Sequence, residues 1–154
     1  MKNISNFIVI IVLLISVSGS AQNQSIDRLI EQIDNKEAYI VMLKTMSPRI
    51  KSEAGFQLIR IGKSASPYLI RILDQQNKSI IAHFILSEIW KKSWQEEICC
   101  NVETDGRVEI ITINRLRVII DNNQLSATPA DMIQNKTYWK KLCAVNAGFA
   151  SKNN

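Results

Sequence analysis

The sequence predicts a mainly α-helical fold, α+β overall, in which stacked antiparallel helical hairpins precede a small β-hairpin and a C-terminal helix. Residues 54–90 carry apolar stripes at helical spacing, separated by a glycine-containing turn and a polar turn. After Trp94 the apolar spacing changes, and Asp105-Gly106 supplies a tight hairpin turn. Thr128-Pro129 then gives the start signal of the last helix.

Residues 1–21 have the pattern of a secretory signal peptide. Lys2 precedes an apolar run from Phe7 to Val17, interrupted only by Ser16, and small residues follow up to Ala21. The run is shorter than the roughly 20 residues that cross a bilayer. We therefore expect cleavage after Ala21 and export to the periplasm or the exterior, with no membrane span in the remaining chain. An uncleaved N-terminal anchor is the alternative.

The rest of the chain is long enough for one domain with a core. The formal net charge of the 154 residues is +5, but lysine and arginine are scattered singly between apolar residues. Nucleic-acid binding needs positive charge focused on one surface, so we expect no nucleic-acid partner. We divide the exported chain into 22–92, the helical hairpins, and 93–154, the β-hairpin and last helix packed on the same core.

Three helices are expected before Gly62. Ser25 is the expected N-cap of the first, whose apolar face repeats at helical spacing through Ile26, Leu29, Ile30 and Ile33. Asp34, with Glu37 three residues later, resembles a capping box that starts a second helix. Tyr39, Ile40 and Leu43 would form its apolar face, and Ser47-Pro48 would end it. A third helix runs to Ile61, before a left-handed cap at Gly62.

The next segment repeats this plan. Ser66 is the expected N-cap before Pro67, with Leu69, Ile70 and Leu73 on the buried face. Asn77-Lys78-Ser79 is a turn, and a last hairpin helix follows with its apolar face at Ile80, Ile81, Phe84, Ile85 and Ile89. Ala54, Phe56, Leu58 and Ile61 stand 28 residues before Ala82, Phe84, Leu86 and Ile89. Self-similarity near this period is typical of stacked helical hairpins.

In residues 36–91 the chain resembles the HEAT-like repeat family, in its short form of about 30 residues. The pattern is carried by Leu58, Ile61-Gly62, Ala65, Pro67, Leu69, Leu73-Asp74, Ala82 and Leu86. Ile80-Ile81 stands where such repeats usually carry Val-Arg. The resemblance implies a stack of α-hairpins used as a protein-binding scaffold, and it implies no catalytic residue.

After Trp94, residues 97–103 and 108–113 read as the strands of the hairpin, and Val118-Ile119-Ile120 as a possible third strand before Asp121-Asn122-Asn123. In the last helix Thr128 is the N-cap, Pro129 the first position and Asp131 a carboxylate at the third. The residues expected to face inward from this helix are Met132, Tyr138, Trp139, Leu142 and Val145.

Three cysteines leave one thiol unpaired in an exported monomer. Cys99 and Cys100 are neighbours on an expected strand, and Cys143 lies on the last helix. A disulfide from Cys99 or Cys100 to Cys143 would close a loop worth about 3–4 kcal/mol. The alternative is three buried thiols that behave as small apolar residues. A single histidine and no ligand-spaced cysteine pair predict no metal site, and we expect no cofactor.

No catalytic constellation stands out. An enzyme would have to use His83, with Ser87 one turn away, but a catalytic histidine also needs an orienting acid and an oxyanion hole. We therefore expect a non-enzymatic interaction module: an adaptor, inhibitor or immunity-type binder of another envelope or secreted protein. Its expected partner-binding residues are Arg60, Lys63 and Arg71 on the polar ridge of the repeat helices. The alternatives are a small secreted hydrolase using His83, or a purely structural envelope protein.

Overall fold

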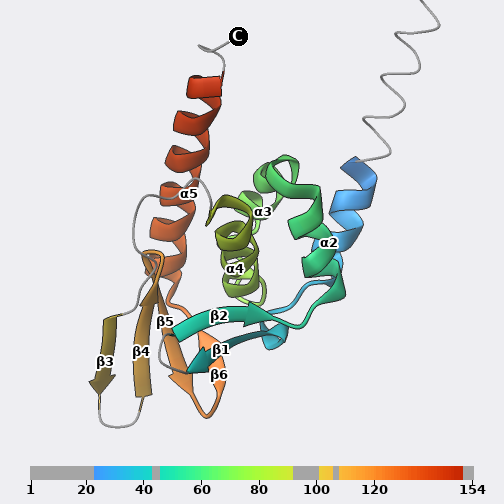
Figure 1. The fold of residues 1–154 in the computed structure, drawn as a ribbon. Helices are drawn as coiled ribbons and strands as arrows, with labels where there is room; N and C mark the ends of the chain where they lie inside the picture. Colours follow the sequence, from blue (N-terminus) through green and yellow to red (C-terminus); the bar gives the residue numbers. More distant parts are fainter. Residues whose placement is uncertain (1–22, 43–45, 92–100, 106–107, 151–154) are drawn as a thin grey trace, which may run out of the picture.

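The structure, a computed structural model, describes residues 23–42, 46–91, 101–105 and 108–150, and it is an α+β fold. Residues 1–21, expected to form a signal peptide, lie outside this part, as do Cys99 and Cys100. Helices pack on one side of the molecule, over a two-stranded and a four-stranded antiparallel sheet (Figure 1). After a helix over residues 23–32, the elements are η1 (Asn35–Glu37), β1 (Ala38–Met42), β2 (Met46–Ile50), α2 (Glu53–Ile61), η2 (Gly62–Ala65), α3 (Ser66–Arg71), α4 (Ser79–Trp90), β3 (Asn101–Asp105), β4 (Val108–Ile113), β5 (Leu116–Asp121), β6 (Gln124–Ser126) and α5 (Pro129–Ala150).

The helix over residues 23–32 buries the apolar face that its spacing predicts. Ile26, Leu29, Ile30 and Ile33 are all buried. Ser25 is not its N-cap, because residues 23 and 24 are already helical. Two carbonyls at the C-terminal end of this helix accept hydrogen bonds from a residue far along the sequence. Lys78 Nζ donates to the carbonyls of Ile30 and Glu31 at 2.6 and 3.0 Å. This contact fixes the helix end beside the start of α4.

Asn35 makes the reciprocal contact to the start of α4. Its Oδ1 accepts hydrogen bonds from the backbone N–H groups of Ile80 and Ile81, each at 3.0 Å. Its Nδ2 donates to the carbonyl of Gln76. Lys78, the local N-cap residue, makes no side-chain capping bond. A residue 45 positions earlier therefore caps α4 in place of a local one.

The prediction of a second helix after Asp34 is wrong for the residues that the structure describes in this segment. Asp34 does cap a turn, since its side chain accepts from the Lys36 N–H, but the turn is a single 3-10 turn. Residues 38–42 and 46–50 form an antiparallel hairpin in which Tyr39 pairs with Arg49 and Ile40 with Pro48. Tyr-Ile-Val in β1 suits a strand better than a helix. Proline is tolerated here because β2 is an edge strand.

The helices α2, α3 and α4 follow the expected segments closely. Ser52 caps α2 by accepting from the Gly55 N–H, and Gly62 ends it with φ +76° and ψ −144°. That φ is positive as expected, but the ψ lies outside the left-handed helical region, in a conformation that only glycine adopts easily. Ser66 does not cap α3; its hydroxyl instead accepts from Trp90 Nε1 at 2.9 Å.

Strands β3 to β6 form a four-stranded meander in sequence order, whereas the sequence predicts a hairpin with a possible third strand. Ile113 pairs with Leu116 and Asp121 with Gln124, so each of these two connections is a two-residue turn. The turn residues Asn114, Arg115, Asn122 and Asn123 all have φ between 47° and 69°. Positive φ at both central positions identifies these as type I′ turns, which match the twist of the paired strands.

The long helix α5 begins at the expected start signal. The Thr128 hydroxyl accepts from the Asp131 N–H and donates to the Asp131 carboxylate. Met132 and Trp139 are buried, and Tyr138 and Leu142 pack against the core. Val145 is 55% exposed, so its expected inward position is wrong.

One core joins both parts of the chain. Buried apolar residues from the helix over 23–32, the β1–β2 hairpin, α2 to α4, the larger sheet and α5 form a single cluster. The helix at its centre is α4, in which every residue from Ser79 to Ser87 is buried. Gly55 lets α2 approach closely, since a Cβ there would lie 2.8 Å from Ile50 Cδ1 and 3.3 Å from Ile85 Cδ1. Within the described residues no helix is long and apolar enough to span a membrane.

Candidate functional site

His83, the residue on which a hydrolase would depend, is fully buried on α4. Its Nε2 donates to the Ile113 carbonyl at 2.9 Å, and its Nδ1 accepts from Trp139 Nε1 at 2.9 Å. These partners fix the ring in the tautomer that carries its proton on Nε2. Since both ring nitrogens are engaged and the ring is closed to solvent, His83 is not placed to exchange a proton with a substrate.

Ser87 does not complete a Ser–His pair. Its hydroxyl donates to the backbone carbonyl of His83 at 2.8 Å and accepts from Asn114 Nδ2 at 2.8 Å. The two side chains therefore bond to different neighbours. Together with Trp139 they form a buried polar network that joins α4, the β4–β5 turn and α5, and its geometry is that of a structural connection.

The pKa of His83 is lowered to about 4, mainly because burial disfavours the charged ring. The Ile113 carbonyl and the nearby Asn135 side chain oppose this shift in part. Asn135 is itself fully buried, and neither its Oδ1 nor its Nδ2 completes a hydrogen bond with any described residue. At neutral pH the His83 ring is therefore uncharged.

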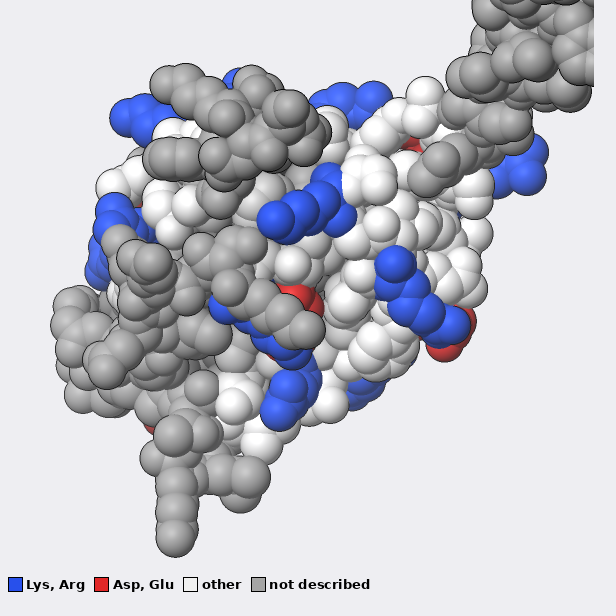
Figure 2. Space-filling view, turned by 45° about the horizontal axis from the view of Figure 1, so that its top comes forward, with Lys and Arg blue, Asp and Glu red and all other residues white. Residues whose placement is uncertain are grey.

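The residues expected to bind a partner, Arg60, Lys63 and Arg71, are exposed, and they contact three different neighbours. Arg60 forms an ion pair with Glu53 at 3.1 Å, and both side chains are largely exposed. Arg71 pairs with Asp27 at 2.5 Å. Lys63 Nζ lies 4.4 Å from the centre of the Trp90 ring. Figure 2 likewise shows lysine and arginine spread over one face in several separate groups.

Cys143 is half-buried on α5, and among the described residues it forms no disulfide. Burial raises its pKa to about 11, although the positive charge of Lys63 acts in the opposite direction. Such a thiol is almost entirely protonated at neutral pH, so Cys143 is not an activated nucleophile. The disulfide to Cys99 or Cys100 stays a prediction, because both of those residues lie outside the described part.

A groove of about 320 Å³ lies between the β1–β2 hairpin, α2 and α4. Its lining is mainly apolar and consists of Tyr39, Pro48, Arg49, Ile50, Phe56, Ile59, Phe84 and Glu88. Two large rings remain substantially accessible there: Tyr39 is 37% exposed and Phe56 is 43% exposed. We call this hollow the aromatic groove. Its volume is near the lower end for ligand pockets, about 300–1,000 Å³, so it suits a few side chains.

The rim of the aromatic groove carries an excess of positive charge. Arg49 lines it, and Lys51 Nζ lies 5.4 Å from the centre of the Tyr39 ring. The carboxylate of Glu88 is already paired with Lys91 at 2.6 Å. Arg49 makes no ion pair within the described part of the chain. The groove therefore combines exposed aromatic rings with cations that could meet carboxylates.

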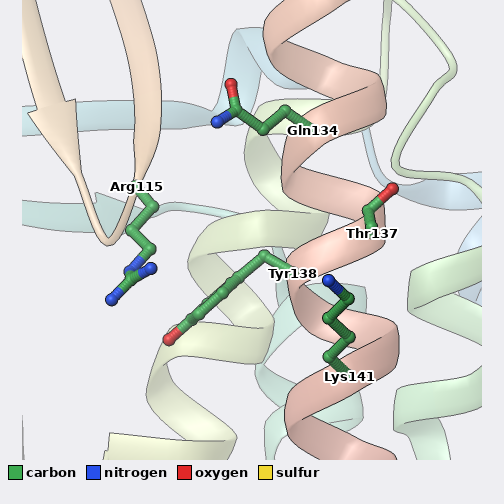
Figure 3. A pocket seen from close by; sticks show the side chains of 5 residues that line it. All are labelled: Arg115, Gln134, Thr137, Tyr138 and Lys141. Atoms are coloured by element: carbon green, nitrogen blue, oxygen red, sulfur yellow. The ribbon is translucent and has the colours of Figure 1, made fainter.

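A second hollow, of about 350 Å³, lies between α5 and the β4–β5 turn. Arg115 comes from the turn, while Gln134, Thr137, Tyr138 and Lys141 lie along one face of α5 (Figure 3). The guanidinium carbon of Arg115 is 5.1 Å from the centre of the Tyr138 ring. We call this hollow the cationic pocket, because its lining includes Arg115 and Lys141 and no carboxylate among the described residues.

Neither hollow is predicted from the sequence. Tyr39 is expected there on a helix face and Phe56 at a repeat position, and Arg115 and Lys141 belong to the scattered charges. A usable signal existed for the cationic pocket, since positions 134, 137, 138 and 141 share one helix face by their spacing. Comparison of the chain with family models, curated proteins and solved structures finds no match. Among the described residues no group of histidine, cysteine and acidic side chains could hold a metal ion.

Proposed function

We propose that the protein is an exported, non-enzymatic interaction module: an adaptor, inhibitor or immunity-type binder of another protein of the envelope or exterior. The observation that carries this proposal is the aromatic groove, with Tyr39 and Phe56 half-exposed in one apolar hollow. Aromatic side chains that are kept accessible in a concave surface are the usual anchors of protein–protein contacts.

The occupant we propose is a segment of the partner protein with large apolar side chains flanked by aspartate or glutamate. The apolar residues would pack on Phe56 and Tyr39, where burial gives about 25 cal/mol for each Å² removed from water. The carboxylates would meet the positive rim formed by Arg49 and Lys51. Charge complementarity of this kind fixes orientation and raises the association rate.

We further propose that α2, α3 and α4 form one HEAT-like hairpin unit. Its support is that six positions of the resemblance, Leu58, Ala65, Leu69, Leu73, Ala82 and Leu86, are completely buried. Ile61 is partly buried against the same core, and Pro67 is exposed. The segment before α2 does not form a further helical hairpin, because residues 38–42 and 46–50 form paired β-strands. In this proposal the β1–β2 hairpin and α5 cover the ends that further repeats would cover in a longer stack.

The ridge of Arg60, Lys63 and Arg71 is a second surface to which the partner could extend. Two of these cations are already paired with exposed carboxylates, Glu53 and Asp27. Exposed pairs of this kind contribute little and exchange readily with other partners. We therefore give the ridge a role in steering the partner rather than in anchoring it.

The hydrolase alternative gains no support from the geometry of His83, because its ring is buried and hydrogen-bonded at both nitrogens. The structural alternative predicts an abundant protein without a stoichiometric partner. Loss of binding when the groove is altered separates it from our proposal.

A selection from displayed peptides tests the groove without a known partner. The exported protein would be used as bait, and selected peptides would be measured against Phe56→Ala, Tyr39→Ala and Ile133→Ala. Ile133 is the matched control because it is an aliphatic side chain, 61% exposed, on α5 away from the groove. We expect apolar peptides with flanking acidic residues whose affinity falls at least about tenfold in the groove variants. Peptides that bind all three variants equally would refute the assignment.

A further inference from the structure

The cationic pocket is separate from the aromatic groove, since the two share no lining residue. We propose that it binds a small oxyanion ligand of charge near −2, a phosphomonoester or a dicarboxylate. The proposal does not depend on the function of the groove. It rests on how α5 and the β4–β5 turn arrange two cations, the Tyr138 hydroxyl and an amide around one hollow.

Helix geometry places the pocket residues of α5 together. Gln134, Thr137, Tyr138 and Lys141 follow one another at the spacing that lines one helix face, and Figure 3 shows them in a row along α5. Trp139, the next residue after Tyr138, points into the core, where it is fully buried. Its bond to His83 fixes the rotation of α5 about its axis. The buried network therefore holds the pocket face outward.

A type I′ turn presents Arg115 to this helix face. Arg115 has φ +69° and Asn114 has φ +47°, so the chain reverses tightly between β4 and β5. Asn114 anchors the turn by donating to Ser87 on α4. The Arg115 guanidinium lies 5.1 Å from the centre of the Tyr138 ring, a cation–π contact that restricts its position. An arginine held in this way loses less entropy when it binds an anion.

The electrostatics of the pocket favour an anion. Its lining supplies two cations, Arg115 and Lys141, with the donor groups of Tyr138 and Gln134 between and beside them, while the Thr137 hydroxyl donates to the Ile133 carbonyl at 3.0 Å. Lys141 makes no ion pair within the described residues, whereas Lys136, on the same helix, is paired with Asp74 at 2.7 Å. Phosphate and carboxylate oxygens accept charge-assisted hydrogen bonds from such donors.

The size of the pocket limits the ligand to a small molecule or a single charged group. A volume of about 350 Å³ accommodates an oxyanion with a few attached atoms. A purely electrostatic surface would respond to ionic strength alone. A formed pocket should instead saturate and distinguish an oxyanion from chloride at the same ionic strength.

The test is an NMR titration of the isotope-labelled protein, recovered from cells that express the full chain. Inorganic phosphate and succinate are the two probes, each balanced with sodium chloride at constant ionic strength. We expect saturable shifts of the amide signals of Gln134, Thr137 and Lys141 with at least one probe. Saturation with phosphate alone would identify a phosphomonoester as the ligand class, and saturation with succinate alone would identify a dicarboxylate. Saturation with both would show that the pocket recognises the charge of the ligand.

Lys141→Met and Lys140→Met form a matched pair, since they remove the same charge from adjacent residues and only Lys141 lines the pocket. Loss of one charge-assisted contact should weaken binding about tenfold or more in Lys141→Met, and less than about twofold in Lys140→Met. Shifts that never saturate, or equal weakening in both variants, would overturn the proposal. A retained native spectrum in both variants confirms that folding is unaffected.

Discussion

The indole N–H of Trp139 donates to Nδ1 of His83 over 2.9 Å, and both side chains are completely buried. This bond joins α5 to α4, while Nε2 of the same ring holds the Ile113 carbonyl at the end of β4. His83 is thus the point where the two largest helices and the main sheet meet. The imidazole thereby satisfies a buried donor from α5 and a buried acceptor from β4 inside the shared apolar core.

Trp139→Phe should destabilise the protein by about 2–4 kcal/mol, because it leaves His83 Nδ1 unsatisfied and removes buried volume. Denaturant unfolding of the variant measures this loss. His83→Leu and the double variant complete a double-mutant cycle, in which we expect a coupling energy of about 1 kcal/mol. Additive losses would mean that the observed bond contributes nothing beyond packing.

His83 should make stability depend on pH. Its pKa is about 4 in the folded protein, below the ordinary 6.5, so the unfolded chain binds more protons between these values. Stability is fully present above about pH 6.5 and is lost as the pH falls towards 4, by about 3 kcal/mol. The unfolding free energy measured across this pH range should depend less on pH in His83→Leu than in the unaltered protein. An unchanged slope in that variant would contradict the assignment.

Asn35→Ala should cost about 1–2 kcal/mol, because it uncaps the first N–H groups of α4 from a position 45 residues away. Gln32→Ala, an exposed change in the preceding helix, is the control and should have little effect. Chemical denaturation of both variants provides the comparison. Equal midpoints for the two would show that solvent replaces the distant cap at no cost.

Asn123→Gly should stabilise the protein by about 0.5 kcal/mol. Asn123 has φ +63° at the second position of a type I′ turn, where glycine avoids the cost of a Cβ. The thermal unfolding midpoint tests this change, and Asn123→Val, which cannot adopt that φ easily, should shift the midpoint in the opposite direction. A destabilised glycine variant would mean that the Asn123 side chain makes the larger contribution.

The local signals in the sequence were sufficient for most elements. Spacing located the helix over 23–32 and α2 to α4, and Thr128-Pro129 located the start of α5. The second helix failed because Tyr39 and Ile40 fit a helical stripe as well as a strand, and only packing against α4 decides between them. The strand β6 was missed because Asn122-Asn123 was treated as the end of a strand rather than as a type I′ turn.

The candidate sites were harder to predict than the fold. The aromatic groove joins Tyr39 and Phe56 with Phe84, and the cationic pocket joins Arg115 with α5. Each depends on contacts between distant segments. The burial of His83 was foreseeable, since a lone histidine among apolar helix positions is more often structural than catalytic. Its two partners, Ile113 and Trp139, were not, because each lies at least 30 residues away.

The measurement that tests the central claim most directly is affinity capture from cross-linked cell envelope and culture medium. The protein would be compared with Phe56→Ala, the ridge variant with Arg60, Lys63 and Arg71 reversed in charge, and the control Ile133→Ala. We predict one stoichiometric protein that is retained by the control, lost from Phe56→Ala and reduced in the ridge variant. A partner captured equally by Phe56→Ala, or no partner in either fraction, would contradict the account.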